Sequence, residues 1–136
     1  MKPFKLFLAG LLASGLLGIS QSFGATAPHA TRTDSGGGVT IKVTYLDSLT
    51  ASDLRFQVVL DTHSVNLDGY DLRTIAVLRD ETGTSYLPTA VENKGSGHHR
   101  ETTVSFAKIA SGTKRVELVI KDVAGIKERI FRWDIE

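Results

Sequence analysis

Apolar and polar residues alternate along most of the chain from residue 39 onward. One apolar side chain at every second position gives a segment one buried face, as a half-buried β-strand requires. No segment shows a convincing helical period. The segments in which this alternation predicts a strand are residues 39–45, 54–60, 72–79, 84–88, 102–106, 115–120 and 129–135.

Seven short strands without a helix predict an all-β chain, and we expect a single seven-stranded immunoglobulin-like antiparallel β-sandwich over residues 39–136. Turn chemistry supports the division into strands. Residues 80–83 are Asp-Glu-Thr-Gly, and this glycine can adopt the positive φ of a tight hairpin turn. Pro88 confines the strand that follows to an edge or an end. Trp133 has the parity of Ile135, which indicates a packing residue of the core.

The N-terminal 24 residues have the pattern of a secretory signal peptide. A basic start with Lys2 and Lys5 precedes an apolar run over residues 6–19, which is shorter than the roughly 20 residues needed to cross a bilayer. We expect cleavage before Ala25, which leaves a mature protein in the periplasm or secreted. The predicted organisation is a signal peptide (residues 1–24), a polar, glycine-rich flexible leader (25–38) and the sandwich domain (39–136).

Composition limits which chemical functions and which classes of binding partner the chain can have. The chain has 16 Lys and Arg against 15 Asp and Glu, a formal charge of +1, and removal of Lys2 and Lys5 with the signal peptide makes it −1. A near-neutral chain lacks the basic surface that binds nucleic acid. The absence of cysteine excludes disulfides, thiol chemistry and a lipoprotein anchor. We expect a monomeric or weakly associating protein that its core alone stabilises, with no membrane span.

Strand direction predicts which loops meet. If successive strands from residue 54 onward are antiparallel, alternate connections lie at the same end, so residues 62–71, the long loop 89–101 and residues 122–128 share one pole. Function in sandwich domains commonly lies in loops clustered in this way. The residues with functional chemistry that we expect at this pole are Asp61, His63, Asp68, Asp71, His98, His99 and Asp122.

The pole contains a candidate metal site. Neutral imidazole suits zinc and divalent copper or nickel, and carboxylates can complete the shell. Adjacent histidines on an extended segment point to opposite sides, but Gly95 and Gly97 permit the bend that one shared ion requires. The alternative is that the histidines are ordinary polar loop residues. If the protein has a specific ligand, we expect a divalent transition metal, zinc or copper, held by His63, His98 and His99 as nitrogen ligands and Asp61 or Asp68 as oxygen ligands.

Two other chemistries have weaker support. Asp68 and Asp71 supply oxygen for calcium, but their spacing fails the EF-hand loop, and Asp68-Gly69 is turn chemistry in its own right. Ser64 is adjacent to His63, yet neighbouring side chains on a strand point apart, and no strand–Ser–helix elbow is present. We therefore expect a binding protein and not an enzyme.

Two segments resemble those of a known group. LDTHSVNLDGYDL (residues 60–72) and GSGHHRETTVSF (95–106) look like segments of small exported bacterial immunoglobulin-like β-sandwich proteins of uncharacterised function, which carry THSV and G-HH segments. The resemblance implies the fold and draws attention to the three histidines of the pole, but it implies no activity. Periplasmic copper-binding sandwich proteins are also similar in size, export and architecture. This chain departs from them because His29 would not be the mature N-terminus and no methionine-rich segment is present.

These observations predict an exported, non-catalytic binding domain that binds a divalent transition metal through loop histidines at one pole. The alternative is a structural or adhesive module with no metal, whose partner is another exported protein. For strand addition to such a partner, residues 39–45 are the more plausible exposed edge, because only a glycine-rich leader precedes them, whereas Pro88 blunts the edge at residues 84–88.

Overall fold

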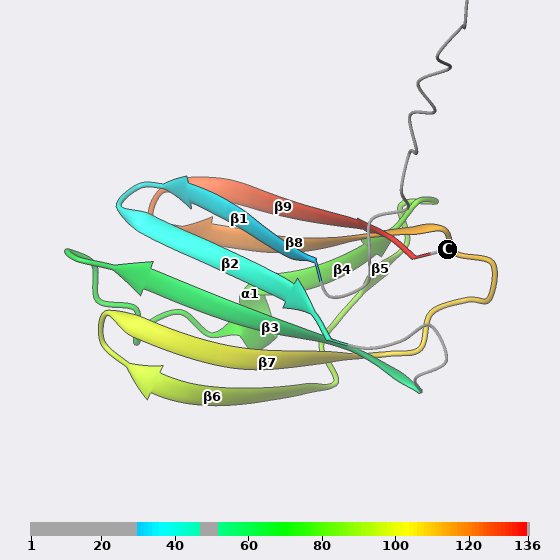
Figure 1. The fold of residues 1–136 in the computed structure, drawn as a ribbon, viewed down its shortest axis with the longest axis horizontal. Helices are drawn as coiled ribbons and strands as arrows, with labels where there is room; N and C mark the ends of the chain where they lie inside the picture. The colour runs from blue at the N-terminus through cyan, green and yellow to red at the C-terminus, as the bar shows by residue number, and fades with distance from the viewer. Residues whose placement is uncertain (1–29, 47–51, 136) are drawn as a thin grey trace, which may run out of the picture.

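The computed structural model describes residues 30–46 and 52–135, which form two antiparallel β-sheets and one short helix. One sheet has five strands in the order β1-β2-β3-β7-β6, and the other has four in the order β5-β4-β8-β9 (Figure 1). The two sheets face each other, so the chain is a β-sandwich. The elements are β1 (Thr31–Gly36), β2 (Val39–Tyr45), β3 (Asp53–Thr62), α1 (Leu72–Ile75), β4 (Ala76–Asp80), β5 (Ser85–Tyr86), β6 (Ala90–Ser96), β7 (His99–Ala107), β8 (Arg115–Val123) and β9 (Ile126–Asp134).

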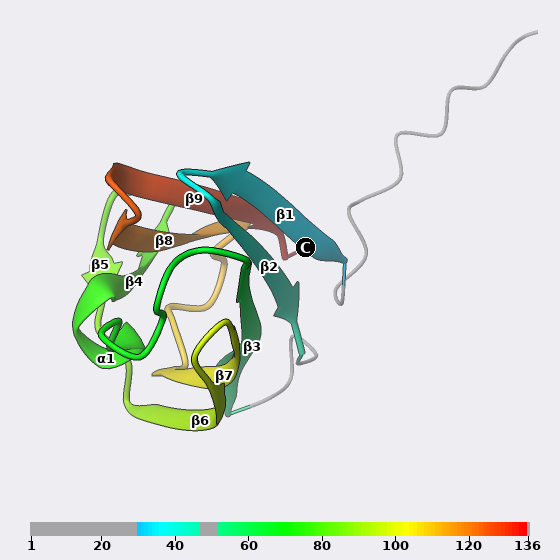
Figure 2. The ribbon, with the colours of Figure 1, turned by 90° about the vertical axis from the view of Figure 1, so that its left-hand side faces the viewer.

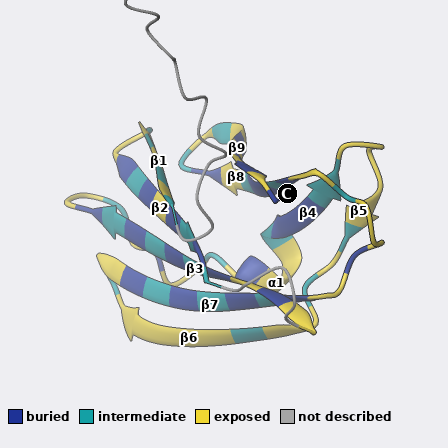
Figure 3. Cartoon of the chain, turned by 45° about the vertical axis from the view of Figure 1, so that its right-hand side comes forward, coloured by how far each residue is buried: buried dark blue, intermediate teal, exposed yellow. Residues whose placement is uncertain are grey.

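The core lies between the two sheets and is made by the inward side of each longer strand (Figure 3). Trp133 of β9 is 1% exposed, which confirms its predicted packing role, and its ring centroid lies 5.2 Å from that of Phe56 on β3. Phe56 also contacts Tyr45 at 5.2 Å and Phe106 at 5.9 Å between centroids. Since burying one such side chain contributes roughly 1.5–3 kcal/mol, this aromatic cluster holds the two sheets together.

The prediction of an all-β chain is confirmed, but the described residues form nine strands and a helix, not seven strands. One extra strand, β1, lies within residues 25–38, so the prediction of a flexible leader is wrong for this part. No residue of β1 is buried, so its sequence shows no alternation of apolar and polar residues. Pairing with β2 holds it in place, and the hydroxyls of Thr31 and Thr44 lie 2.7 Å apart. Residues 1–29, with the predicted signal peptide, lie outside the described residues.

The segment 72–79, predicted as one strand, divides into α1 and β4. Asp71 caps the helix, because its side chain accepts a hydrogen bond from the Arg73 N–H at 2.9 Å. Leu72 is buried, and Ile75, three residues later, packs against the core from the same helical turn. A helix of four residues is too short to show a helical period, which explains the error.

The segment 89–101, predicted as one long loop, contains β6, a two-residue turn at Gly97-His98 and the start of β7. β6 is an edge strand, and none of its residues is buried (Figure 3). It pairs antiparallel with β7, which pairs antiparallel with β3. The additional strand therefore leaves the β6–β7 turn at the end of the sandwich where β3 finishes.

Candidate binding surface at the histidine pole

Four connections meet at one end of the sandwich, which we call the histidine pole (Figure 2). The Thr62 N–H donates to the His98 carbonyl oxygen at 3.0 Å, and the Ala124 N–H donates to the Tyr70 hydroxyl at 2.9 Å. These bonds confirm the prediction that the connections after β3, before β7 and after β8 share one pole. The four connections are the β1–β2 turn at Gly37-Gly38, residues 63–71, the β6–β7 turn at Gly97-His98 and the β8–β9 turn at Ala124-Gly125.

The segment 63–71 is fastened to the β6–β7 turn by a reciprocal pair of hydrogen bonds. The Leu67 N–H donates to the Gly97 carbonyl oxygen at 2.9 Å, and the Gly97 N–H donates to Asp68 Oδ1 at 2.8 Å. Gly97 has a φ of 70°, a conformation that favours glycine at the first position of a two-residue turn. Asp68, a predicted metal ligand, therefore braces two loops against each other.

Thr62 fastens the start of the same segment. Its hydroxyl donates to the Gly38 carbonyl oxygen of the β1–β2 turn at 2.7 Å. The Thr62 hydroxyl oxygen also accepts from the N–H groups of Ser64 and Val65, each at 3.2 Å. One buried threonine thus ties three parts of the pole together and satisfies two loop amides.

Arg100 holds the segment from inside the sandwich. The residue is 7% exposed, and its Nη1 donates to the carbonyl oxygens of Leu67 at 2.6 Å and Tyr70 at 2.5 Å. Its Nη2 donates to Asn93 Oδ1 at 2.9 Å. A buried guanidinium needs acceptors for its fixed fork of donors, and here loop carbonyls provide two of them.

Arg129 has the same task on the opposite side of the pole. It is 1% exposed; Nη1 donates to the Val39 carbonyl oxygen at 3.1 Å, and Nη2 donates to those of Gly36 at 2.7 Å and Val123 at 3.1 Å. The Asp34 carboxylate lies 3.6 Å from Nη1. Arg129 thereby joins the β1–β2 turn to the β8–β9 turn.

Sequence reasoning did not single out either arginine, although strand parity contains the signal. Arg100 has the parity of Val104 on β7, and Arg129 has the parity of Trp133 on β9, so both lie at core positions of their strands. A charged residue at a core position is rare unless hydrogen bonds compensate its burial. Such a position in an apolar strand therefore indicates an arginine that anchors loops.

The five predicted metal ligands lie in different places on the pole. Nδ1 of His99 contacts Oδ1 of Asp61 across β7 and β3, with side chains 62% and 40% exposed. His63 lines a surface hollow together with Asp61. His98 is exposed in the turn, and Asp68 is bonded to the backbone of that turn. The structure thus brings Asp61 and His99 into contact. His63 lines the hollow next to Asp61.

No group of three or more His, Asp or Glu residues lies close enough to hold a metal ion within residues 30–46 and 52–135. Asp61 contacts His99 and lines a surface hollow together with His63. The described residues contain no carboxylate cluster for calcium either, because Asp71 caps α1 and Asp68 accepts from the Gly97 N–H.

Backbone strain also gathers at the histidine pole. In the part of the chain that the structure describes, the residues other than glycine with positive φ are Asp122 at 55° and Ala124 at 52°. Each such residue costs roughly 1–2 kcal/mol relative to an ordinary conformation. The β1–β2 turn packs closely on this backbone, because a Cβ added at Gly37 would lie 2.3 Å from the Ala124 carbonyl oxygen.

The other end of the sandwich, which we call the opposite pole, consists of the β4–β5 turn and residues 108–114. Asp80 organises the turn: Oδ1 accepts from the Thr82 hydroxyl at 2.6 Å and from the N–H groups of Thr82 at 2.9 Å and Thr84 at 3.0 Å. Oδ2 accepts from the Tyr86 hydroxyl at 2.9 Å. These bonds, that of the Thr82 hydroxyl above all, hold the pKa of Asp80 below its ordinary value of 3.8, and the bond to Asp80 raises the pKa of Tyr86 above 10.0.

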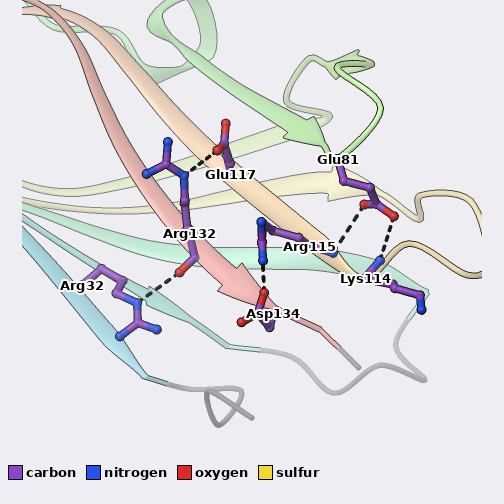
Figure 4. A network of polar contacts seen from close by, with 7 residues as sticks. All are labelled: Arg32, Glu81, Lys114, Arg115, Glu117, Arg132 and Asp134. Atoms are coloured by element: carbon purple, nitrogen blue, oxygen red, sulfur yellow. Dashed lines mark hydrogen bonds and ion pairs between the residues drawn. The ribbon is translucent and has the colours of Figure 1, made fainter. Parts of the chain in front are cut away.

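Glu81 joins this turn to the start of β8. Its carboxylate accepts from the backbone N–H groups of Lys114 at 3.1 Å and Arg115 at 3.4 Å (Figure 4). Hydrogen bonds from backbone N–H groups, its own first and then that of Lys114, lower the pKa of Glu81 below 4.5. At this pole carboxylates therefore satisfy the loop amides.

A group of arginines extends from the opposite pole over the outer face of the four-stranded sheet (Figure 4). Glu117 pairs with Arg132 at 2.5 Å and with Arg79 at 3.4 Å, and Asp134 pairs with Arg115 at 3.0 Å. These cations alternate with carboxylates along the sheet, so the face is charged but not strongly basic. Exposed pairs of this kind contribute only about 0–1 kcal/mol each.

No protein-family model matches the sequence, and neither a curated protein nor a solved structure matches it. Among the described residues, no helix is long and apolar enough to cross a membrane. The resemblance to small exported sandwich proteins therefore stays a prediction that the sequence segments alone carry.

Proposed function

We propose that the protein is an exported, non-catalytic binding domain that contacts another exported protein through its histidine pole. The observation that carries this proposal is that buried arginines and a buried threonine fix the loops of the pole from beneath, while His63, His98 and His99 stay exposed above them. A surface whose backbone is already ordered loses less entropy when it binds a partner.

Backbone strain at the histidine pole also favours this surface as the binding site. Asp122 and Ala124 have positive φ at this pole, whereas Gly83 and Gly112 have the positive φ values at the opposite pole. Strained backbone persists only where the surrounding structure holds it, and it clusters at sites of function. A binding role for the histidine pole gives this strain a purpose.

We also propose that the sandwich is of the immunoglobulin-like type. The order β2-β3-β7-β6 facing β4-β8-β9 has the arrangement of four strands against three that such domains use, with Greek-key connections between the sheets. On this proposal β1 and β5 are additions to the two sheets. Loops clustered at one end of these sandwiches are their usual binding surface.

A zinc or copper site at the pole is the second candidate. The observation in its favour is the contact of Asp61 with His99, next to a hollow that His63 lines. Asp61 and His99 alone are an incomplete shell, because protein sites for zinc use at least three protein ligands, and no group of three forms among the described residues. The partner-protein proposal therefore ranks above the metal proposal.

Site-specific photocrosslinking tests the proposed surface. A photoreactive amino acid is introduced at position 63 or 98, and for the matched control at Ser111, which is exposed at the opposite pole. In cells that produce and export the protein, we expect a defined crosslinked partner from positions 63 and 98 and none from position 111. Equal labelling from both poles, or none from either, would contradict the proposal.

Thermal melts separate the two candidates. We expect the unfolding midpoint to stay the same in excess Zn²⁺ or Cu²⁺, whereas a ligand of the folded state at a hundredfold excess over Kd would add about 2.7 kcal/mol. A metal-induced rise that His99→Ala abolishes and Ser111→Ala preserves would establish the metal site instead.

A further inference from the structure

The four sheet edges of the sandwich differ in how they are protected. β1 and β9 lie beside each other and are joined by side-chain bonds: Trp133 Nε1 donates to the Ala30 carbonyl oxygen at 2.9 Å, and Arg32 Nε donates to that of Arg132 at 3.1 Å. β5 is an edge of two residues. β2 is internal, so the prediction of an open edge at residues 39–45 is wrong. Within the described chain, β6 is the long edge that no other strand covers.

β6 is held firmly on its inner side. Asn93 Oδ1 accepts from Arg100 Nη2 and from the Thr102 hydroxyl, each at 2.9 Å. Glu92 and Lys94 point to the outer face, where they lie opposite Thr103 and Glu101 of β7. An ordered strand with a free row of backbone donors and acceptors is a template for pairing with another strand.

We propose that β6 pairs antiparallel with β6 of a second copy of the chain, about a two-fold axis at Asn93. This register places Glu92 of each copy directly opposite Lys94 of the other, on the same face. The result is a symmetric dimer in which two five-stranded sheets join into one.

Charge selects this register over its neighbours. The side-chain period of a strand is two residues, so the alternative symmetric registers that keep the same backbone groups facing are centred on position 92 or 94. They would place Glu92 opposite Glu92, or Lys94 opposite Lys94, and like charges directly opposite each other destabilise a strand pair. Centring on Asn93 converts both repulsions into attractions.

An exposed apolar side chain supports an occupant at this edge. Leu87 is 71% exposed and lies in the crossover from β5 to β6, three residues before the edge begins. In an antiparallel pair, the start of one β6 lies beside the end of the other. The second copy would then cover surface near Leu87 that the monomer leaves in water.

Charge reversal in sedimentation equilibrium, on the chain as purified from producing cells, tests the dimer. We expect Glu92→Lys or Lys94→Glu to weaken self-association by about tenfold, since each turns two symmetry-related attractions into repulsions. The Glu92→Lys, Lys94→Glu double variant restores the opposite charges and should restore the dimer. The matched controls Glu128→Lys and Lys127→Glu change the same charges on β9 and should leave association unchanged.

A disulfide test fixes the register independently, because the native chain has no cysteine. The Glu92→Cys, Lys94→Cys double variant should form a disulfide-linked dimer under oxidation, whereas Glu92→Cys alone should not, since position 92 faces position 94. A chain that stays monomeric up to about 1 mM, single reversals without effect, a double reversal that fails to recover, or equal crosslinking of the single cysteine variant would each overturn the proposal.

Discussion

The two poles of the sandwich differ in how charged side chains satisfy their loop backbones. At the histidine pole, Arg100 and Arg129 donate from buried positions to five backbone carbonyl oxygens. At the opposite pole, the carboxylates of half-buried Asp80 and exposed Glu81 accept from backbone N–H groups. Side-chain acceptors satisfy loop N–H groups at both poles, and Thr62 and Asp68 provide them at the histidine pole, where buried arginine donors are added.

The difference has a consequence for pH. A guanidinium stays protonated across the accessible pH range, whereas the carboxylates at the opposite pole lose their charge in acid. The arginine donors of the histidine pole therefore keep their charge in acid, whereas the hydrogen bonds that the Asp80 carboxylate accepts at the opposite pole weaken there.

Replacing a buried arginine should have the largest effect. Arg129→Met keeps most of the side-chain volume but leaves the carbonyl oxygens of Gly36, Val39 and Val123 without this donor. Unsatisfied buried groups cost about 1–3 kcal/mol each, so we expect a loss of at least about 3 kcal/mol in the free energy of unfolding. Urea unfolding at neutral pH measures it.

Arg132→Met on the same strand is the matched control. The Arg132 side chain is 60% exposed and pairs with Glu117, so its loss should stay within about 1 kcal/mol. Because backbone carbonyl oxygens do not titrate, the loss of stability in Arg129→Met should also persist unchanged at low pH. A loss that disappears in acid would show that the arginine acts mainly through its neighbour Asp34, 3.6 Å away, and not through the carbonyls.

At the opposite pole, Asp80→Asn should give a smaller, pH-dependent effect. The folded-state pKa of Asp80 lies below its ordinary value of 3.8, so the ionised carboxylate contributes stability that is present above that pH. This contribution is lost as pH falls below 3.8 toward the folded-state pKa. Melting midpoints of wild type and variant should therefore differ most near neutral pH and converge in acid.

Tyr86→Phe is the matched variant for this test. It removes one donor to Asp80 and keeps the carboxylate, so we expect a smaller loss of midpoint near neutral pH than Asp80→Asn causes. A midpoint difference between wild type and Asp80→Asn that stays constant from neutral pH to about pH 3 would show that only neutral hydrogen bonds matter at this turn.

The sequence predicts those strands in which burial of one face requires apolar residues at alternate positions. β2, β3, β7 and β9 each bury one face, so their buried residues alternate with less buried ones. β8 alternates as far as Leu118, and Val119 and Ile120 are buried as well. β1 and β6 bury no residue, and their Thr, Ser, Glu and Lys side chains suit a loop as well as an edge strand. Each of these strands forms a hairpin with the next strand, across the turns at Gly37-Gly38 and Gly97-His98. Backbone pairing alone requires no apolar residue at alternate positions, so it leaves no alternation in the sequence.

The candidate site was predictable to a similar depth. Counting strand directions places His63, His98 and His99 at one end, because direction depends only on the number of strands. Which side chains converge depends on register and turn geometry. Asp68 reaches the Gly97 N–H only because a two-residue turn puts that amide in front of it, and this kind of detail is absent from composition and spacing.

Relief of backbone strain at Ala124 should have the smallest effect on stability, and it tests directly whether the strain of the histidine pole serves binding. Ala124→Gly relieves a φ of 52°, and we expect a gain of about 0.5–1 kcal/mol in urea unfolding. Gly83→Ala at the opposite pole is the mirror experiment: φ is 86° there and no atom lies within 4 Å of an added Cβ, so backbone strain alone should cost about 1 kcal/mol.

A loss of stability in Ala124→Gly would show that contact of the Ala124 methyl group with the β1–β2 turn outweighs the strain. If stability rises as expected, the crosslinking yield from position 98 then decides what the strain is for. Strain that holds the pole in its binding geometry predicts a more stable variant that captures less partner. Strain without a role predicts a more stable variant with unchanged capture.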